Sequence, residues 1–269
     1  FYDTGRELPV EPYTLGVILG DGHIEKTGYV TVTSWDESIL DSLGVAGYRG
    51  EHELGSGEWS RPLRHWGLAG KRSHEKFIPE MYLTARGDER RALLAGLLDT
   101  DGTAPRSWAQ FASTSEALAD GVVALGRSLG LVCKKSSGVT KKYRYKGELK
   151  QGMRAWTVAV KSVASPFLLE RKSSRWKVAR LRPVPMRFID SIEPSEPEDS
   201  VCIKVAARDG LYVTRDFIVT HNTAVLNAIW AALAGASAIQ PVPIRLGEDS
   251  ARIQLDLGEI IVTRTFKRT

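Results

Sequence analysis

The chain has few cysteines and no long uncharged apolar run. Its 269 residues include two cysteines, Cys133 and Cys202, which lie far apart and form no Cys-x-x-Cys spacing. This excludes a disulfide framework and a structural zinc site. The longest apolar stretch, 224–239, contains Asn227 and is too short to span a membrane. The first residues lack the basic start and apolar run of a signal peptide. We therefore expect an intracellular protein (cytoplasmic, nucleoid-associated or phage-encoded) with no membrane partner.

The charge is distributed unevenly along the chain. The net charge is +5, but residues 134–182 contain fifteen Lys or Arg and two Glu, which gives this segment +13 and the remainder −8. The basic residues are interleaved with Tyr143, Tyr145, Trp156 and Trp176. Such a pattern is typical of a sheet that lies along a polyanion. We expect double-stranded DNA to be the partner.

Two segments of the chain are alike. Residues 14–22 (TLGVILGDG) and 94–102 (LAGLLDTDG) consist of apolar or small residues and end in Asp-Gly. Each run predicts a buried helix, and Gly102 is expected to end its helix in the left-handed conformation. Close approach of the two helices would be allowed by small residues in both segments: Gly16, Gly20, Ala95 and Gly96.

The helix pair would bring Asp21 and Asp101 together. A pair of facing carboxylates is suited to divalent cations. The two segments resemble the paired motifs of the LAGLIDADG (dodecapeptide) homing endonucleases borne by inteins. This resemblance implies an α+β fold of two pseudosymmetric αββαββα repeats with DNA-binding β-saddles. It also implies a monomeric endodeoxyribonuclease that cuts both strands of a specific site, with Asp21 and Asp101 holding Mg²⁺ (two or more divalent ions).

The flanking sequence supports an internal duplication. After the first motif, alternating runs predict strands and Asp36 is expected to cap a helix that ends at Leu43. After the second motif, Thr114 or Ser115 is expected to cap the equivalent helix. The predicted strands are 28–35, 48–54 and 62–68 in the first repeat, and 108–113, 131–139 and 154–160 in the second; the second helix is predicted over 116–129.

A lysine lies between the two repeats. In the family that the chain resembles, a Lys just before Ile-Pro belongs to the active site, and this position corresponds to Lys76. An ammonium near the cleaved phosphate would offset negative charge or position water. The sequence leaves open which residue is its counterpart in the second repeat: Lys134, Lys135 or Lys161.

One face of each predicted sheet is expected to lie in the DNA major groove, where base pairs can be distinguished. The polar residues of the strands and their flanks are therefore the candidate contacts. They are Thr31, Thr33, Arg49, Arg61, Arg64, His65, Gln110, Lys141, Arg144, Lys146, Lys150 and Arg154.

After Arg182 the sequence predicts short strands that end at His221-Asn222-Thr223. This tripeptide resembles the C-terminal splice junction of an intein. The Asn amide can attack its own carbonyl, the His can transfer a proton and the Thr hydroxyl can accept the acyl group. Because the chain opens directly before the first motif, the N-terminal half of the intein is expected to be missing, which leaves cleavage after Asn222 as the residual reaction.

The sequence from Thr223 onward predicts a helix and then two strands, 252–257 and 259–266. It resembles the start of a P-loop ATPase of the SMC and ABC type, with Thr223 as the Mg²⁺-binding Thr and the preceding segment of the host ATPase missing. We expect four parts: LAGLIDADG repeat 1 (1–87), repeat 2 with the basic region (88–182), an all-β (Hint) splicing element (183–222) and an ATPase fragment (223–269). Two alternatives remain at this stage: a catalytically silent DNA-binding module, and a fragment of a P-loop ATPase.

Overall fold

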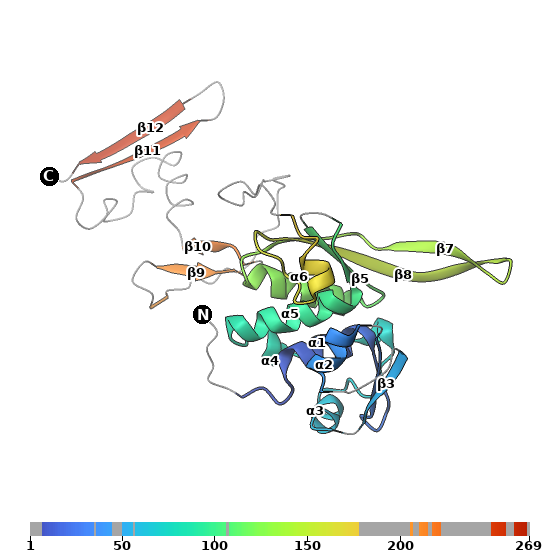
Figure 1. Cartoon of the computed structure of the whole chain (residues 1–269). Helices are drawn as coiled ribbons and strands as arrows, with labels where there is room; N and C mark the ends of the chain where they lie inside the picture. Colours follow the sequence, from blue (N-terminus) through green and yellow to red (C-terminus); the bar gives the residue numbers. More distant parts are fainter. Residues whose placement is uncertain are drawn as a thin grey trace. The chain divides into compact units, whose positions relative to one another are not determined.

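The computed structural model divides the chain into two units, residues 1–190 and 191–269 (Figure 1). The structure describes residues 7–34, 36–44, 50–55, 57–105, 108–177, 205–206, 210–214, 217–221, 249–256 and 261–267. Among these residues, no helix is long and apolar enough to cross a membrane. Both predicted repeats fall in the first unit, and their apolar side chains belong to one core.

The centre of the first unit is a pair of helices, α1 (Pro12–Asp21) and α5 (Gly87–Asp101). Glu11 caps α1 because its carboxylate accepts hydrogen bonds from the backbone N–H of Tyr13 and Thr14. Pro12 follows at the first helical position, where no backbone N–H is needed. Both motif segments are therefore helical, as predicted.

Glycines bring the two helices into backbone contact. A Cβ on Gly16 would lie 2.5 Å from the Leu93 carbonyl oxygen, and a Cβ on Gly96 would lie 2.3 Å from the Tyr13 carbonyl oxygen. A Cβ on Gly20 would lie 2.0 Å from Thr100 Oγ1. Because residues 16 and 20 face residues 96 and 100 in order, the helices run parallel and their C-termini lie at the same end.

The residue after each helix is extended, which corrects the expectation of a left-handed cap. Gly22 has φ −78° and ψ 139°, and Gly102 has φ −97° and ψ 150°. The glycines are needed for space instead. A Cβ would lie 2.5 Å from the Ile18 carbonyl oxygen at Gly22 and 2.3 Å from the Leu98 carbonyl oxygen at Gly102. The chain therefore turns directly from each helix into a short strand.

The first repeat continues as a three-stranded antiparallel sheet in the order β1 (Gly22–Ile24), β2 (Val30–Ser34), β3 (Gly50–Gly55). Helix α2 (Glu37–Ser42) follows β2 and is capped by Asp36, as predicted. Val30 and Val32 are buried, whereas Thr31 and Thr33 point to the other side of the sheet.

The predicted strand over 62–68 is wrong. This segment begins with helix α3 (Ser60–His65), and Gly67 follows the helix with φ +72°. Pro62 lies in the first turn of α3, where a proline costs no hydrogen bond. The apolar residues Leu63 and Leu68 are both fully buried, but their spacing of five residues does not fit the two-residue period of a strand. The 3₁₀ turn η1 (Ser73–Glu75) and helix α4 (Glu80–Leu83) then lead to α5.

The second repeat has a five-stranded sheet in which β4 (Gly102–Thr103), β5 (Trp108–Ser113), β8 (Glu148–Lys161) and β6 (Val132–Lys135) are neighbours. Helix α6 (Glu116–Ser128) is capped by Ser115, whose hydroxyl accepts a hydrogen bond from Leu118 N–H at 3.1 Å. Helices α5 and α6 cover one face of the sheet. The short helix α7 (Glu170–Ser173) follows β8.

Strands β7 (Val139–Tyr145) and β8 form a hairpin that projects beyond the helices (Figure 1). All seven residues of β7 are exposed. The strand predicted over 131–139 is shorter, because β6 ends at Lys135 and Val139 begins β7. The strand predicted over 154–160 is part of β8, which is longer than expected and also pairs with β7.

The second unit contains two separate hairpins among its described residues. Strands β9 (Leu211–Val213) and β10 (Val219–His221) pair antiparallel, with His221 opposite Leu211. Strands β11 (Ser250–Asp256) and β12 (Ile261–Lys267) also pair antiparallel, as the alternating sequence predicts. Cys202, Asn222, Thr223 and the predicted helix after Thr223 lie outside the described residues.

Candidate active site

The parallel helix pair brings the two predicted acids together. Asp21 is the last residue of α1 and Asp101 is the last residue of α5, and both side chains are exposed at the shared end. Two effects raise the pKa of Asp101 to about 6. Partial burial from water is the larger effect, and repulsion from the Asp21 carboxylate is the second. Loss of water also raises the pKa of Asp21 above its usual range. The two carboxylates interact electrostatically, although 80 residues separate them in the sequence.

Lys76 lies beside the end of α1. Its side chain is buried, and its Nζ donates to the backbone oxygens of Ile18 (3.0 Å), Leu19 (3.0 Å), Gly20 (3.4 Å) and Gly22 (2.6 Å). The first three carbonyls belong to the last turn of the helix, whose carbonyl groups have no partners inside the helix, and Gly22 directly follows it. Lys76 therefore closes the helix end and places a positive charge next to Asp21.

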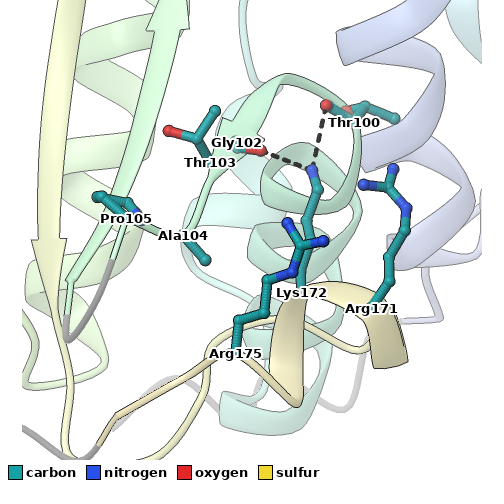
Figure 2. A pocket seen from close by; sticks show the side chains of 8 residues that line it. All are labelled: Thr100, Gly102, Thr103, Ala104, Pro105, Arg171, Lys172 and Arg175. Atoms are coloured by element: carbon teal, nitrogen blue, oxygen red, sulfur yellow. Dashed lines mark hydrogen bonds between the residues drawn. The ribbon is translucent and has the colours of Figure 1, made fainter.

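The counterpart of Lys76 is Lys172, which the sequence did not single out. Its Nζ donates to the oxygens of Leu98 (2.9 Å), Asp99 (2.6 Å), Thr100 (3.4 Å) and Gly102 (2.6 Å). Figure 2 shows the bonds to Thr100 and Gly102. Each acceptor is 80 residues beyond the corresponding acceptor of Lys76, so the two lysines occupy equivalent positions.

The three lysines considered from sequence lie elsewhere. Lys135 forms ion pairs with Glu116 and Asp120 on α6. Lys134 and Lys161 are exposed on the sheet of the second repeat. Lys172 was missed because it is not followed by Ile-Pro and lies in a short helix beyond the last strand.

Burial and neighbouring acids act in opposite directions on the two lysines. Burial lowers the pKa of Lys76 to about 8, while Asp101 and Asp21 raise it. Burial, and then the neighbouring Arg171, lower the pKa of Lys172, while Asp99, Asp21 and Asp101 raise it. In return, both lysines lower the pKa values of Asp21 and Asp101. The cluster therefore contains two acids whose charges are stabilised by two buried cations.

Asp99 holds the segment that carries Lys172. Its side chain is 1% exposed, and its Oδ2 accepts hydrogen bonds from the N–H groups of Leu168 (3.2 Å) and Leu169 (3.1 Å) and from the Tyr13 hydroxyl (3.1 Å). Burial raises the pKa of Asp99, which the hydrogen bonds partly offset. In the first repeat the corresponding residue is Leu19, and the segment with Lys76 is held instead by Ser115, whose hydroxyl donates to the Lys76 carbonyl at 2.6 Å.

The donor set at the two acids fits a divalent cation. Among the described residues, no group of three or more His, Cys, Asp or Glu side chains could hold a metal by itself. Mg²⁺ is usually bound by one or two carboxylates, with water and substrate phosphate oxygens in the remaining positions. Two exposed carboxylates that repel each other meet this description.

The predicted DNA contacts fall into three groups. Thr31, Thr33 and Gln110 lie on the sheet faces opposite the buried residues. Arg61, Arg64 and His65 are exposed on helix α3 and are therefore not strand residues, which corrects the prediction. The remaining described candidates are exposed on the β7–β8 hairpin: Lys141, Arg144, Lys146, Lys150 and Arg154. Arg49 lies outside the described residues.

The sequence matches known homing endonucleases over part of its length. Residues 78–167 match the family model "Homing endonuclease". This range includes Asp101 and the sheet of the second repeat, and it confirms the predicted resemblance for that segment. Asp21, Lys76 and Lys172 lie outside the matched range, so their assignment rests on the pseudosymmetric geometry.

One curated relative is replicative DNA helicase DnaB of Mycobacterium intracellulare. It is 36% identical over 225 residues, which cover 81% of this chain and 36% of the helicase. The chain thus spans about a third of the length of this relative. The relative is a helicase, so it does not support the predicted SMC or ABC type of ATPase.

The comparison with solved structures returned partial matches to a homing endonuclease. A mesophilic variant of the homing endonuclease I-DmoI has a TM-score of 0.37 and 14% identity, and the match covers 61% of this chain and 94% of that chain. I-DmoI in complex with DNA and Mn has a TM-score of 0.32 and 15% identity, with 56% and 88% covered. Similarities of this size do not establish a function for this chain.

Proposed function

We propose that residues 1–182 form a monomeric homing endonuclease that makes double-strand breaks at a specific site in DNA. The observation that carries this proposal is the pairing of Asp21 with Asp101 at one end of a parallel helix pair, with a buried lysine beside each acid. Two equivalent half-sites are what the hydrolysis of two strands requires. The match of residues 78–167 to the homing endonuclease family supports the same reaction.

In this proposal Asp21 and Asp101 hold Mg²⁺, which supplies Lewis-acid stabilisation of charge at the phosphate and activation of water. Lys76 and Lys172 keep the two carboxylates ionised because each places a positive charge next to the helix end. Their amino groups already donate to backbone oxygens. We therefore assign them an electrostatic and positioning role beside the reacting atoms.

The open faces of the two sheets are proposed to contact DNA. In the second repeat, Thr103 pairs with Gln110, and Ala159 lies between Gln110 and Lys134. Ala109, Phe111 and Val160 point to the other side and are buried. Side chains alternate along a strand, so a polar row faces away from the helices. In the separate sheet of the first repeat, His23 pairs with Thr31 and these residues form a similar polar row.

The β7–β8 hairpin continues this surface. Because paired residues share a face, Tyr143 lies beside Lys150, and the Lys150 ammonium is 5.0 Å from the centre of the Tyr145 ring. At roughly 3.3 Å per residue, the seven residues of β7 are long enough to follow about six base pairs. Aromatic rings among cations are suited to a nucleic acid backbone.

The test is cleavage of DNA by the full chain. A library of randomised duplexes is incubated with the protein and Mg²⁺, and cut molecules are sequenced and then retested as single substrates. The expected result is double-strand cleavage of one long sequence by the wild type and no cleavage by Asp101→Asn. Sequence-specific binding without cutting in Mg²⁺ would instead favour the silent DNA-binding module. Binding of ATP by the chain would favour the alternative of a P-loop ATPase fragment.

We also propose that residues 183–222 are the C-terminal part of an intein splicing domain and that residues 223–269 belong to its host protein. The β9–β10 hairpin ends at His221, directly before the proposed junction. A homing endonuclease inserted as part of an intein would explain why a chain with a homing endonuclease segment is similar to a replicative helicase. Mass spectrometry of the purified chain tests the junction. Cleavage after Asn222 is expected, and its loss in Asn222→Ala would confirm the chemistry.

A further inference from the structure

A cavity of about 380 Å³ lies beside Lys172, between helix α7 and the end of α5. Its wall contains three basic residues, Arg171, Lys172 and Arg175, and no acidic residue. The opposite side is formed by Thr103, Ala104 and Pro105. Figure 2 shows the Arg171 and Arg175 side chains on either side of Lys172. The cavity adjoins residues 100 and 102, which flank Asp101.

The three basic side chains differ in the groups to which they already donate hydrogen bonds. The Lys172 amino group donates to backbone oxygens, so its charge is present but its donors are used. Arg171 donates from Nε to Asp36, the residue that caps α2 in the first repeat. Arg175 is exposed and forms no ion pair with any carboxylate of the described residues. A guanidinium has five N–H donors, so both arginines retain donors for a further anion.

The residues next to Lys76 in the first repeat differ in charge from those next to Lys172. The residue before Lys76 is Glu75, whereas the residue before Lys172 is Arg171. Glu75 accepts a hydrogen bond from Arg72 N–H at 3.0 Å and pairs with Lys71 at 3.4 Å. The residue that corresponds to Arg175 is Pro79. The two helices contact each other symmetrically, but the residues that correspond to Arg171 and Arg175 are not basic in the first repeat.

We propose that Arg171, Arg175 and the Thr103 hydroxyl form a binding site for one backbone phosphate of the DNA strand that passes Asp101. Guanidinium groups bind phosphate oxygens through two parallel hydrogen bonds. The cavity lies within a few residues of Asp101 and no carboxylate lines it, although Arg171 also contacts Asp36. This inference rests on the proposed function, and it adds that the two strands are held unequally.

The consequence is a difference between the rates at which the two strands are cut. Loss of one charge-assisted hydrogen bond typically costs about tenfold or more in an equilibrium or a rate. Arg175→Gln is expected to slow cleavage of one strand by about tenfold and to leave the other strand within about twofold. A supercoiled plasmid that carries the selected site would then accumulate as the nicked form before it becomes linear.

The experiment compares Arg175→Gln, Arg175→Lys and the control Arg86→Gln in the full chain. Arg86 is exposed at the opposite end of α5 and pairs with Asp88 and Glu89. A duplex labelled on each strand in turn reports the two rates, and circular dichroism checks that each variant is folded. Arg175→Lys should recover only part of the rate, because an ammonium lacks the planar pair of donors.

A scan with single neutral methylphosphonates identifies the bound phosphate. One position should weaken binding by the wild type about tenfold in Ca²⁺ and have no further effect on Arg175→Gln. Equal slowing of both strands, or additive effects at every position, would overturn the proposal. If the wild type binds but does not cut, the endonuclease function fails, and the binding scan still decides whether the phosphate site exists. Failure to bind any duplex would overturn both.

Discussion

The two repeats are alike where they touch and different where they face outward. Gly16 and Gly96 place backbone against backbone, and Lys76 and Lys172 bind equivalent carbonyl groups. Away from this seam, the first repeat has three paired strands among its described residues and the second has five. Glu75 and Arg171 differ in sign at corresponding positions. The comparison indicates that the proposed catalytic arrangement constrains the contact between the two helices, whereas the outer surfaces of the two repeats differ.

The strongest test of the comparison removes one acid from each half. Asp21→Asn and Asp101→Asn should each reduce double-strand cleavage by more than about a hundredfold, which exceeds the usual effect of removing an outer-shell partner of a metal. Each carboxylate is expected to hold metal, so neither half can replace the other. Cleavage of a selected duplex in Mg²⁺ measures the effect. Normal cutting of both strands by either variant would contradict the paired site.

The two lysines provide the next test. Lys76→Met and Lys172→Met should each lower cleavage by about 10- to 100-fold, because each variant removes a cation that keeps the adjacent acids ionised. It also leaves the last carbonyl groups of a helix without a donor. Rates measured separately for the two labelled strands show whether the positions are equivalent. As a control, Lys135→Met should retain cleavage within a few fold, because Lys135 pairs with Glu116 and Asp120 on α6.

Backbone contact at the seam predicts a loss of stability. Gly96→Ala would place a Cβ 2.3 Å from the Tyr13 carbonyl oxygen, and we expect the free energy of unfolding to fall by about 1–3 kcal/mol. Gly87→Ala is the matched control on the same helix, because the nearest atom to its Cβ would be 3.8 Å away. It should be neutral or stabilise by up to about 1 kcal/mol. Urea titration followed by circular dichroism distinguishes the two.

The acid pair also predicts how stability depends on pH without metal. The pKa of Asp101 is raised to about 6 from 3.8, so the folded state binds this proton more tightly than the unfolded state. Its contribution to stability is present below about pH 4 and is lost as the pH rises through about 6. Because the side chain is exposed, we expect an effect of roughly 1 kcal/mol.

Thermal unfolding in EDTA at pH 4.5 and 7.5 measures this effect. Asp101→Asn should remove most of the difference in stability between the two pH values. Asp21→Asn should also reduce this difference. A wild-type protein that is more stable at pH 7.5, with no change in Asp101→Asn, would show that the carboxylates do not repel each other.

The smallest predicted effect concerns the β7–β8 hairpin, which has no counterpart among the described residues of the first repeat. Lys150→Gln should reduce the slope of log Kd against log salt by about 0.9, the value for one phosphate contact in B-DNA. Arg86→Gln, at the far end of α5, should leave the slope unchanged. Fluorescence anisotropy at several salt concentrations measures both slopes. An unchanged slope for Lys150→Gln would exclude this residue from the DNA interface.

The paired acids could be predicted from sequence because the two motifs repeat with the same spacing of small residues and Asp-Gly. Lys172 could not, because its position depends on Asp99 binding the segment at Leu168 and Leu169, a contact between residues about 70 apart. Helix α3 was mistaken for a strand, although Pro62 in its first turn is compatible with a helix. The positive charge of residues 134–182 indicated a polyanionic partner. It did not indicate that Arg171 and Arg175 share a cavity with Thr103.

The contact of backbone with backbone at Gly16 and Gly96 restricts how the sequence of such a protein can evolve. A seam lined by side chains can be repacked stepwise, because a larger residue on one helix is compensated by a smaller one on the other. Here neither helix has a side chain to shorten. Substitutions that redirect the protein to a new ligand are therefore expected to accumulate on the sheets, the hairpin and α7, while these glycines remain fixed.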